Sequence, residues 1–119
     1  MSIYQDAEAE VMEGVQFVAA APKLMEILDV VSSVYGIGKM DMMSLRRFPH
    51  MVEARDAFYW SARTLTPRTY SEIGRFFADR DHSTVWEGIV RVRQRFDAHK
   101  ERLAKVIAKL GVDMGELKP

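Results

Sequence analysis

The segment FADRDHSTVWEG, residues 77–88, holds the densest group of chemically active side chains in the sequence. It places carboxylates, a guanidinium, an imidazole and hydroxyls side by side before apolar sequence resumes. Such groups could act in catalysis, ligate a metal, contact nucleic acid or simply begin a helix. The residues concerned are Asp79, Arg80, Asp81, His82, Ser83 and Thr84.

Catalysis and metal binding have little support in the sequence. Asp81 and His82 are adjacent at a predicted helix start, where neighbouring side chains rarely face one another, and no G-x-S-x-G segment supplies a serine nucleophile. The sequence has no cysteine, and its histidines, His50, His82 and His99, lack the spacing of a helical metal pair. We expect no catalytic residue, no metal site and a protein that is not an enzyme.

A phosphate-binding loop is suggested only by Gly36-Ile-Gly-Lys39. A Walker A loop requires a serine or threonine after its lysine and a buried strand before its first glycine. Here Met40 follows the lysine, and helical patterns flank the segment. We interpret it as a turn and expect no cofactor.

Two helices with a short polar turn are predicted to position the polar cluster. Thr69 and Glu72 have the spacing of a capping box, which opens a helix that stops near Asp79. Asp81 is a good N-cap for a second helix that begins at His82. This order is typical of a helix-turn-helix, and an ordinary helical hairpin remains the alternative.

The second helix is predicted to be long. Its apolar positions follow spacings of four and three up to Gly111, which ends it, and His99 is the one polar residue among them. Gly74, inside the first helix, indicates close approach of the two helices near Val85 and Ile89. The apolar positions are Val85, Ile89, Val92, Phe96, Leu103, Val106 and Leu110.

The rest of the sequence also predicts helices, so the fold class is all-α. Periodic apolar residues indicate helices at residues 4–20, 23–35 and 50–65, and Asp41 can cap a short segment that ends at Leu45. We divide the chain into an acidic N-terminal helical extension at residues 1–22, a helix-turn-helix domain at 23–97 and a C-terminal helical extension at 98–119. The terminal helices could pair within one chain or form a homodimer.

Charge is distributed unevenly along a chain whose net charge is zero. Residues 1–30 carry six carboxylates and one lysine, a sum of −5, whereas residues 44–96 carry ten arginines, no lysine and six carboxylates, a sum of +4. Arginine suits forked contacts to phosphates and guanine edges. Nucleic-acid binding and a salt-bridged helical surface both fit this pattern.

Length and hydropathy indicate one domain-sized unit away from membranes. The 119 residues can form one modest core. No apolar run approaches the roughly 20 residues that cross a bilayer. The start, MSIYQDAEAE, is acidic and lacks the features of a signal peptide. We expect a cytoplasmic, nucleoid-associated protein.

The stretch EIGRFFADRDHSTVWEG, residues 72–88, resembles the C-terminal DNA-binding domain (domain IV) of the bacterial replication initiator DnaA, whose pattern is approximately EIG-x-x-F-G-x-R-D-H-[ST]-T-V. The similarity extends without a gap from about Ile27 to Arg95. It implies a Trp-repressor-like helical fold and recognition of double-stranded DNA at boxes of the TTATNCACA type.

The resemblance also implies which residues contact DNA. The start of the second helix would face the major groove, with Arg80 supporting it, and the start of the first helix would approach the backbone or thymine methyls. Arg47 would enter the adjacent minor groove, and Arg55 and Arg91 would contact phosphates. The implied helix residues are Thr69, Tyr70 and Ser71 in the first helix and Asp81, His82, Ser83 and Thr84 in the second.

The sequence departs from the family at positions near the DNA backbone. Glu53, Asp56 and Glu87 are acidic where the family tends to be basic or neutral, so we expect weaker affinity. Ser83 replaces threonine, and Ser71 stands where proline is common. The ATP-binding motor of the initiator is absent, so we expect a stand-alone protein.

Three functional interpretations follow. The first is sequence-specific binding to DnaA-box-type sites that modulates replication initiation or transcription. The alternative is a protein-interaction module that regulates replication initiation proteins, with weak or vestigial DNA binding. In the third, the acidic N-terminal helix covers the arginine surface and inhibits DNA binding in cis.

Overall fold

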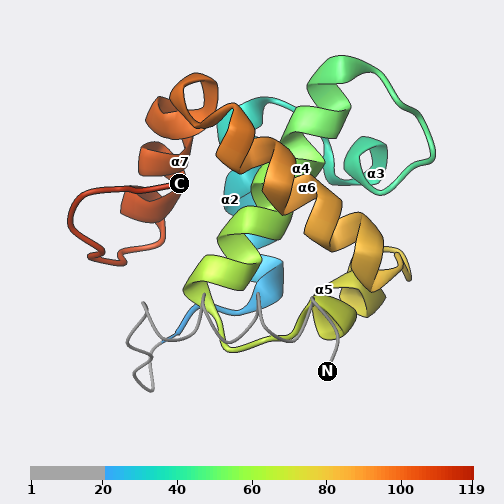
Figure 1. Cartoon of the computed structure of the whole chain (residues 1–119), viewed down its shortest axis with the longest axis horizontal. Coiled ribbons are helices and arrows are strands. Elements are labelled where there is room, and N and C mark those ends of the chain that lie inside the picture. Colours follow the sequence, from blue (N-terminus) through green and yellow to red (C-terminus); the bar gives the residue numbers. More distant parts are fainter. Residues whose placement is uncertain (1–20) are drawn as a thin grey trace.

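The computed structural model describes residues 21–119, and helices make up most of this part of the chain (Figure 1). No strand occurs among these residues. The predicted all-α fold is therefore confirmed, whereas the helix expected at residues 4–20 lies outside the described residues. In chain order the helices are α2 (Leu24–Tyr35), α3 (Lys39–Met42), α4 (Pro49–Leu65), α5 (Tyr70–Phe76), α6 (His82–Gln94) and α7 (Phe96–Lys109).

The long helices α2 and α4 begin and end close to the residues that the sequence predicted. Gly36 ends α2 in the left-handed region with φ of 68°, a conformation that costs glycine least. α4 has Pro49 in its first turn and ends before Thr66-Pro67, where the Thr66 hydroxyl donates to the Ala62 carbonyl at 2.7 Å. The helices predicted at 23–35 and 50–65 are confirmed.

The short helix α3 begins earlier than expected. Asp41 was predicted to cap a segment that ends at Leu45, but Asp41 lies inside α3, and Gly38 precedes its first turn. The Gly38 carbonyl accepts from the Met42 amide at 3.0 Å, so the helix begins at Lys39, two residues before Asp41. Leu45 is left in the loop between α3 and α4.

α4 is the centre of the core and contacts every other described helix. Figure 1 shows it running through the middle of the molecule, with α2 behind it and α6 in front. The ring of Phe58 stacks against Phe76 and Phe77, with centroids 5.9 Å and 5.0 Å apart. α4 therefore anchors the helices of the helix-turn-helix on one side and α2 on the other.

The prediction of one helix from His82 to Leu110 is wrong, because the chain leaves helical geometry at Arg95 (φ −117°, ψ 35°). The apolar seam itself continues through the break, with Val92, Phe96 and Leu103 buried. α6 packs on α4 and α5, whereas α7 packs chiefly on α2. One straight helix could not follow both surfaces. The boundary predicted at residue 97 therefore falls inside α7.

A polar cluster fastens α7 to α2 and α4. The Tyr35 hydroxyl lies 2.7 Å from His99 Nδ1, and the Arg102 guanidinium lies 4.3 Å from the centre of the Tyr35 ring. Arg102 also donates to Glu53 at 3.4 Å. His99 is 2% exposed, and burial lowers its pKa, an effect to which nearby Arg102 and Arg95 add and which Glu53 opposes.

Acidification should destabilise the fold through His99. Because burial lowers the folded pKa of His99, the unfolded chain binds a proton that the folded chain does not once the pH falls below about 6.5. The free energy of unfolding should then decrease, by at most about 1.4 kcal/mol per pH unit. Urea denaturation between about pH 7 and about pH 5 measures this dependence.

His99→Gln should reduce that pH dependence, whereas His50→Gln, at an exposed position on α4, should retain it. The same pH dependence in His99→Gln and in the wild type would contradict the assignment.

Candidate nucleic-acid interface

The first helix of the motif begins with the predicted capping box. The Thr69 hydroxyl accepts from the Glu72 amide at 3.2 Å, and Glu72 accepts from the Thr69 amide at 3.1 Å. The bond from the Thr69 backbone, followed by side-chain bonds from Arg68 and Thr69, lowers the pKa of Glu72 despite partial desolvation. This reciprocal pair fixes where α5 begins and how it enters the motif.

The turn between α5 and α6 is tight. Ala78 and Asp79 adopt positive φ, at 55° and 53°. The Arg80 amide donates to the Gly74 carbonyl at 2.7 Å, and a Cβ at Gly74 would lie 2.2 Å from the Arg80 carbonyl oxygen and 3.5 Å from Val85. The expected close approach at Gly74 is confirmed, and its nearest neighbour is the turn backbone.

The N-terminus of α6 presents the polar cluster to solvent. Asp81 caps the helix by accepting from the Ser83 amide at 3.2 Å. Contrary to expectation, Asp81 and His82 do contact each other, with 2.9 Å between Oδ1 and Nδ1, and both side chains are exposed. Ser83 and Thr84 are partly exposed beside them. The contact orients the imidazole at the helix tip.

Two arginines hold the start of the loop between α3 and α4. Arg55, from α4, donates through Nε to the Met42 carbonyl and through Nη2 to the Ser44 carbonyl at 2.9 Å. Arg80, from the turn, donates to the carbonyls of Met43 and Ser44 at 3.1 Å and 2.7 Å. The Ser44 carbonyl is thus shared by both guanidinium groups, which ties the loop to the helix-turn-helix.

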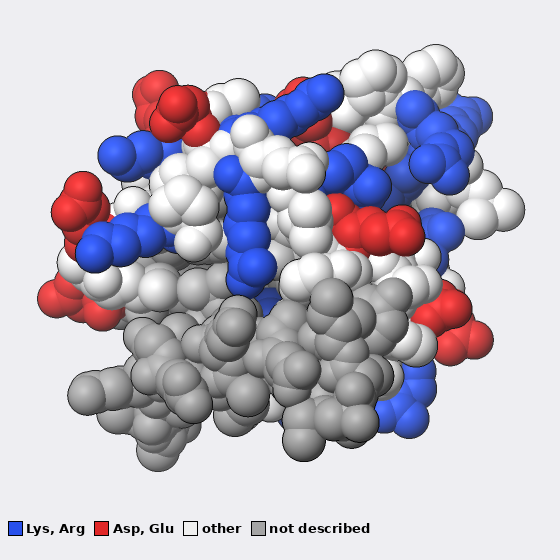
Figure 2. All heavy atoms as spheres, viewed as in Figure 1, with Lys and Arg blue, Asp and Glu red and all other residues white. Residues whose placement is uncertain are grey.

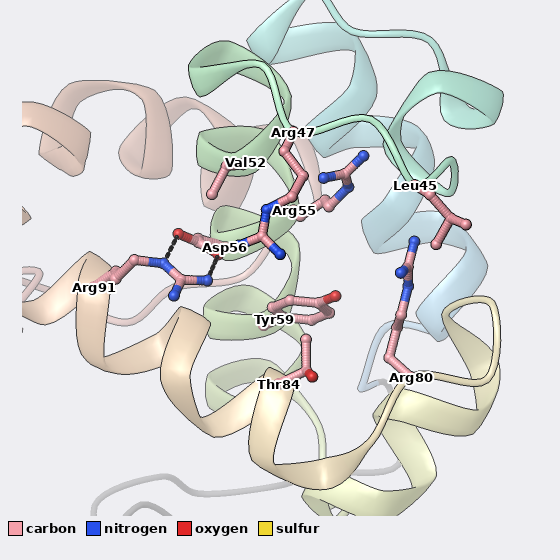
Figure 3. Close-up of a pocket in the computed structure, with 9 residues that line it drawn as sticks. All are labelled: Leu45, Arg47, Val52, Arg55, Asp56, Tyr59, Arg80, Thr84 and Arg91. Atoms are coloured by element: carbon pink, nitrogen blue, oxygen red, sulfur yellow. Dashed lines mark hydrogen bonds and ion pairs between the residues drawn. The ribbon is translucent and has the colours of Figure 1, made fainter.

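A small hollow separates this loop from α6 (Figure 3). Its volume of about 130 Å³ is below the several hundred Å³ typical of small-molecule sites. Tyr59 lies at its base, and burial raises the pKa of Tyr59 to about 12. Burial and the nearby Arg80 lower the pKa of Arg55. The lining residues are Leu45, Arg47, Val52, Arg55, Asp56, Tyr59, Arg80, Thr84 and Arg91.

Arg91 and Asp56 form a forked ion pair across the α4–α6 contact. Arg91 Nε and Nη2 donate to the two carboxylate oxygens at 2.8 Å and 3.0 Å. Burial raises the pKa of Asp56, an effect that the bond from Arg91 opposes, and the same bond raises the pKa of Arg91. Gly88 makes the contact possible, because a Cβ there would lie 2.5 Å from the Tyr59 ring and 2.8 Å from Asp56.

Two of the three unusual acidic residues have partners within the chain. Asp56 is paired with Arg91, and Glu53 with Arg102. Glu87 is exposed on α6, and its charge acts on Arg91. Figure 2 shows basic side chains gathered over the side of the molecule occupied by α3 and the following loop, with acidic side chains close by.

The structure places the residues expected to contact DNA at very different depths. Arg47, Ser71, Asp81 and His82 are exposed, and Thr69, Arg80, Ser83, Thr84 and Arg91 are partly exposed. Arg55 and Tyr70 are buried. The Tyr70 ring lies against Trp86 at 5.8 Å and below the Arg63 guanidinium at 5.3 Å. Tyr70 therefore also packs α5 against α6. The DNA contacts of all these expected residues stay predictions.

Sequence reasoning missed Tyr59, Leu45 and Val52 as lining residues of the hollow. Tyr59 lies within an almost continuous run of buried residues in α4, so burial does not distinguish its position beside the loop. Leu45 was assigned to a helical segment. Its exposure of 84% is visible only in the structure.

Residues 21–119 contain no cluster of three or more histidines and carboxylates that could hold a metal ion. None of the helices in this range combines the length and the apolar character needed to cross a membrane.

A family model described as "Bacterial dnaA protein helix-turn-helix" matches residues 24–92, more than half of the chain and nearly all of α2 to α6. The chain belongs to this bacterial DnaA family. The resemblance carried by residues 72–88 is thus confirmed. A DnaA helix-turn-helix indicates a DNA-binding, non-catalytic module.

The relatives are chromosomal replication initiator proteins DnaA. The protein of Sphingopyxis alaskensis is 35% identical over 102 residues, which cover 86% of this chain and 22% of that protein. The protein of Rhizobium meliloti is 34% identical over 83 residues, which cover 67% of this chain and 17% of that protein. The protein of Rhodopseudomonas palustris is 37% identical over 70 residues, which cover 59% of this chain and 15% of that protein. The chain spans about a fifth of these relatives or less.

Gly74→Ala should destabilise this DnaA-type domain. The added Cβ meets the Arg80 backbone at 2.2 Å, so the turn must move. A 2.2 Å contact with backbone atoms places the overpacking cost in the upper part of the usual range of about 1–3 kcal/mol, above the gain in helix propensity of about 1 kcal/mol. We expect a net loss of roughly 1–2 kcal/mol in urea denaturation.

Gly38→Ala is the matched control, because the nearest atom to its Cβ lies 4.0 Å away. Equal stability of the two variants would show that the turn does not depend on close approach at Gly74.

Proposed function

We propose that this chain binds double-stranded DNA at DnaA-box-type sites, and that it thereby modulates replication initiation or transcription. In this proposal the N-terminus of α6 reads the major groove, and Arg47 enters the adjacent minor groove. The observation that carries it is the hydrogen-bonded tie from Arg80 to the α3–α4 loop, which sets two DNA-contacting elements at a fixed separation.

The chemistry of the α6 tip suits base recognition. His82, Ser83 and Thr84 are short hydrogen-bonding side chains, and the threonine methyl suits a thymine methyl. The first amides of α6 and the positive end of its dipole favour a nearby phosphate. Arg47, on the opposite side of the hollow, suits a narrow A/T-rich minor groove.

The names of the relatives extend the proposal from DNA binding to replication. They are chromosomal replication initiators, so this chain would share their boxes and compete for or mark those sites. In this proposal it works in the cytoplasm at the nucleoid, alone or with replication initiation proteins.

His82→Ala should reduce the discrimination between a box duplex and a scrambled duplex. The imidazole lies at the exposed tip of α6, and one good base contact is worth about 1–3 kcal/mol. Fluorescence anisotropy with both duplexes across a salt series measures the affinity ratio, which should fall by about tenfold or more.

Gln94→Ala, at the exposed far end of the same helix, is the control and should keep the ratio of the wild type. If wild-type protein binds both duplexes equally weakly, sequence-specific recognition is wrong.

Asp56→Asn should tighten DNA binding without improving specificity. The substitution removes a negative charge from the hollow and releases Arg91, whose side chain is 43% exposed, toward a backbone phosphate. One more phosphate contact should steepen the salt dependence by about one unit, equally for box and scrambled duplexes. Breaking the pair should also lower the free energy of unfolding by roughly 1–3 kcal/mol.

Asp97→Asn is the charge-matched control, because Asp97 is exposed in the first turn of α7. An unchanged salt slope in Asp56→Asn would place Arg91 out of reach of DNA phosphates.

A second candidate is a protein-interaction module of the replication machinery with weak DNA binding. It is favoured by the internal use of Arg55, Arg80 and Arg91, whose guanidinium groups bond to carbonyls or to Asp56. The anisotropy series separates the two candidates, since the module predicts weak, sequence-independent binding that vanishes at moderate salt.

A further inference from the structure

Two large apolar side chains flank the exposed arginines of the α3–α4 loop. Leu45 is 84% exposed and Phe48 54% exposed, on either side of Arg46 and Arg47. Single exposed apolar residues are common on protein surfaces. An apolar pair on either side of two cations on one short loop indicates a binding surface more strongly than a single exposed apolar residue does. Such a pair combines apolar contact area with attraction for a polyanion.

The loop is held at both ends. At its start, the Ser44 carbonyl accepts from Arg55 and Arg80 at 2.9 Å and 2.7 Å, and the Ser44 hydroxyl donates to the Asp41 carbonyl at 2.7 Å. At its end, Phe48 is the N-cap residue of α4, and its ring stacks on His50 with centroids 5.9 Å apart. Little further ordering is therefore needed when the loop inserts into a ligand.

Leu45 lies on the side of the loop that borders the hollow, together with Arg47 and Thr84 (Figure 3). Its side chain therefore shares a face with the arginine assigned to the minor groove and with the start of α6. A duplex that occupies both grooves would cover Leu45.

Charge favours nucleic acid as the occupant. No carboxylate occurs from Met42 to Val52, whereas two exposed arginines do. An apolar protein groove could take Leu45 and Phe48, but it would leave Arg46 and Arg47 without an anionic partner. Minor-groove proteins combine arginine with an apolar side chain that wedges between base steps.

We propose that Leu45 is an apolar wedge, which enters the minor groove beside Arg47 and partly unstacks an A·T-rich base step, with Phe48 against the neighbouring sugars. The inference rests on the proposed DNA binding. It adds a contact whose strength depends on how easily the DNA base step deforms, in addition to the charge contacts of the arginines. Flexible steps would bind better than stiff ones, because unstacking them costs less.

The test uses the full chain and a TTATNCACA-type duplex that carries 2-aminopurine in its A/T-rich half. Wild-type protein should raise the 2-aminopurine fluorescence on binding. Leu45→Ala should lose that rise and bind about tenfold more weakly, with the salt slope unchanged because no charge is lost. Arg47→Ala should instead flatten the slope by about one unit.

Met40→Ala is the control, because Met40 is 88% exposed on α3, outside the loop. It should behave as wild type. Leu45→Lys is the second variant: it should steepen the salt slope yet still lose the fluorescence rise. Because Leu45 is exposed, both variants should keep the helical circular dichroism of wild type.

The outcomes separate the two proposals. If wild type binds the box duplex specifically and Leu45→Ala matches it in affinity and fluorescence, the wedge is wrong and the DNA-binding proposal stands. If wild type binds no duplex, both fail. If Leu45→Ala changes only self-association in sedimentation, the loop contacts a second copy and the wedge is again wrong.

Discussion

The shared carbonyl of Ser44 is the contact on which the candidate interface depends. Arg55 reaches it from the core helix α4 and Arg80 from the turn of the motif, so one backbone oxygen joins three segments far apart in sequence. Charge-assisted bonds of this kind are roughly twice as strong as neutral ones. They fix the loop relative to α6, and therefore the spacing at which two grooves could be contacted together.

Close backbone approach is the second constraint, and two glycines provide it. Gly74 lets the turn fold against α5, and Gly88 lets α6 lie directly on Tyr59 of α4. The Asp56–Arg91 pair then fixes the rotation of α6 about its axis. A buried ion pair adds little net stability, since desolvation offsets much of the attraction, but it does select one orientation. Asp56 therefore orients α6, although its sequence position suggested a lost phosphate contact.

Local signals in the sequence were sufficient to predict the caps of α5 and α6, although not that of α3, and they could not predict contacts between distant residues. The capping box of Thr69 and the N-cap of Asp81 depend on neighbours within three residues, and both are confirmed. The break at Arg95 leaves the apolar spacing intact, so periodicity could not reveal it. The partners of Arg55 and Arg91 lie 11 to 35 residues away. Composition alone cannot tell an arginine that binds carbonyls from one that faces a phosphate.

That distinction changes the meaning of the positive middle segment. Its sum of +4 includes Arg55, Arg80 and Arg91, which bond within the chain, and Arg68, which pairs with Glu72. Fewer arginines are left exposed without these bonds: Arg46 and Arg47 lie on the α3–α4 loop, and Arg75 and Arg95 lie elsewhere. Fewer phosphate contacts imply a shallower dependence on salt. In the proposed function, discrimination between DNA sequences would then depend more on base edges and on duplex shape, which the rigid spacing between loop and helix is suited to read.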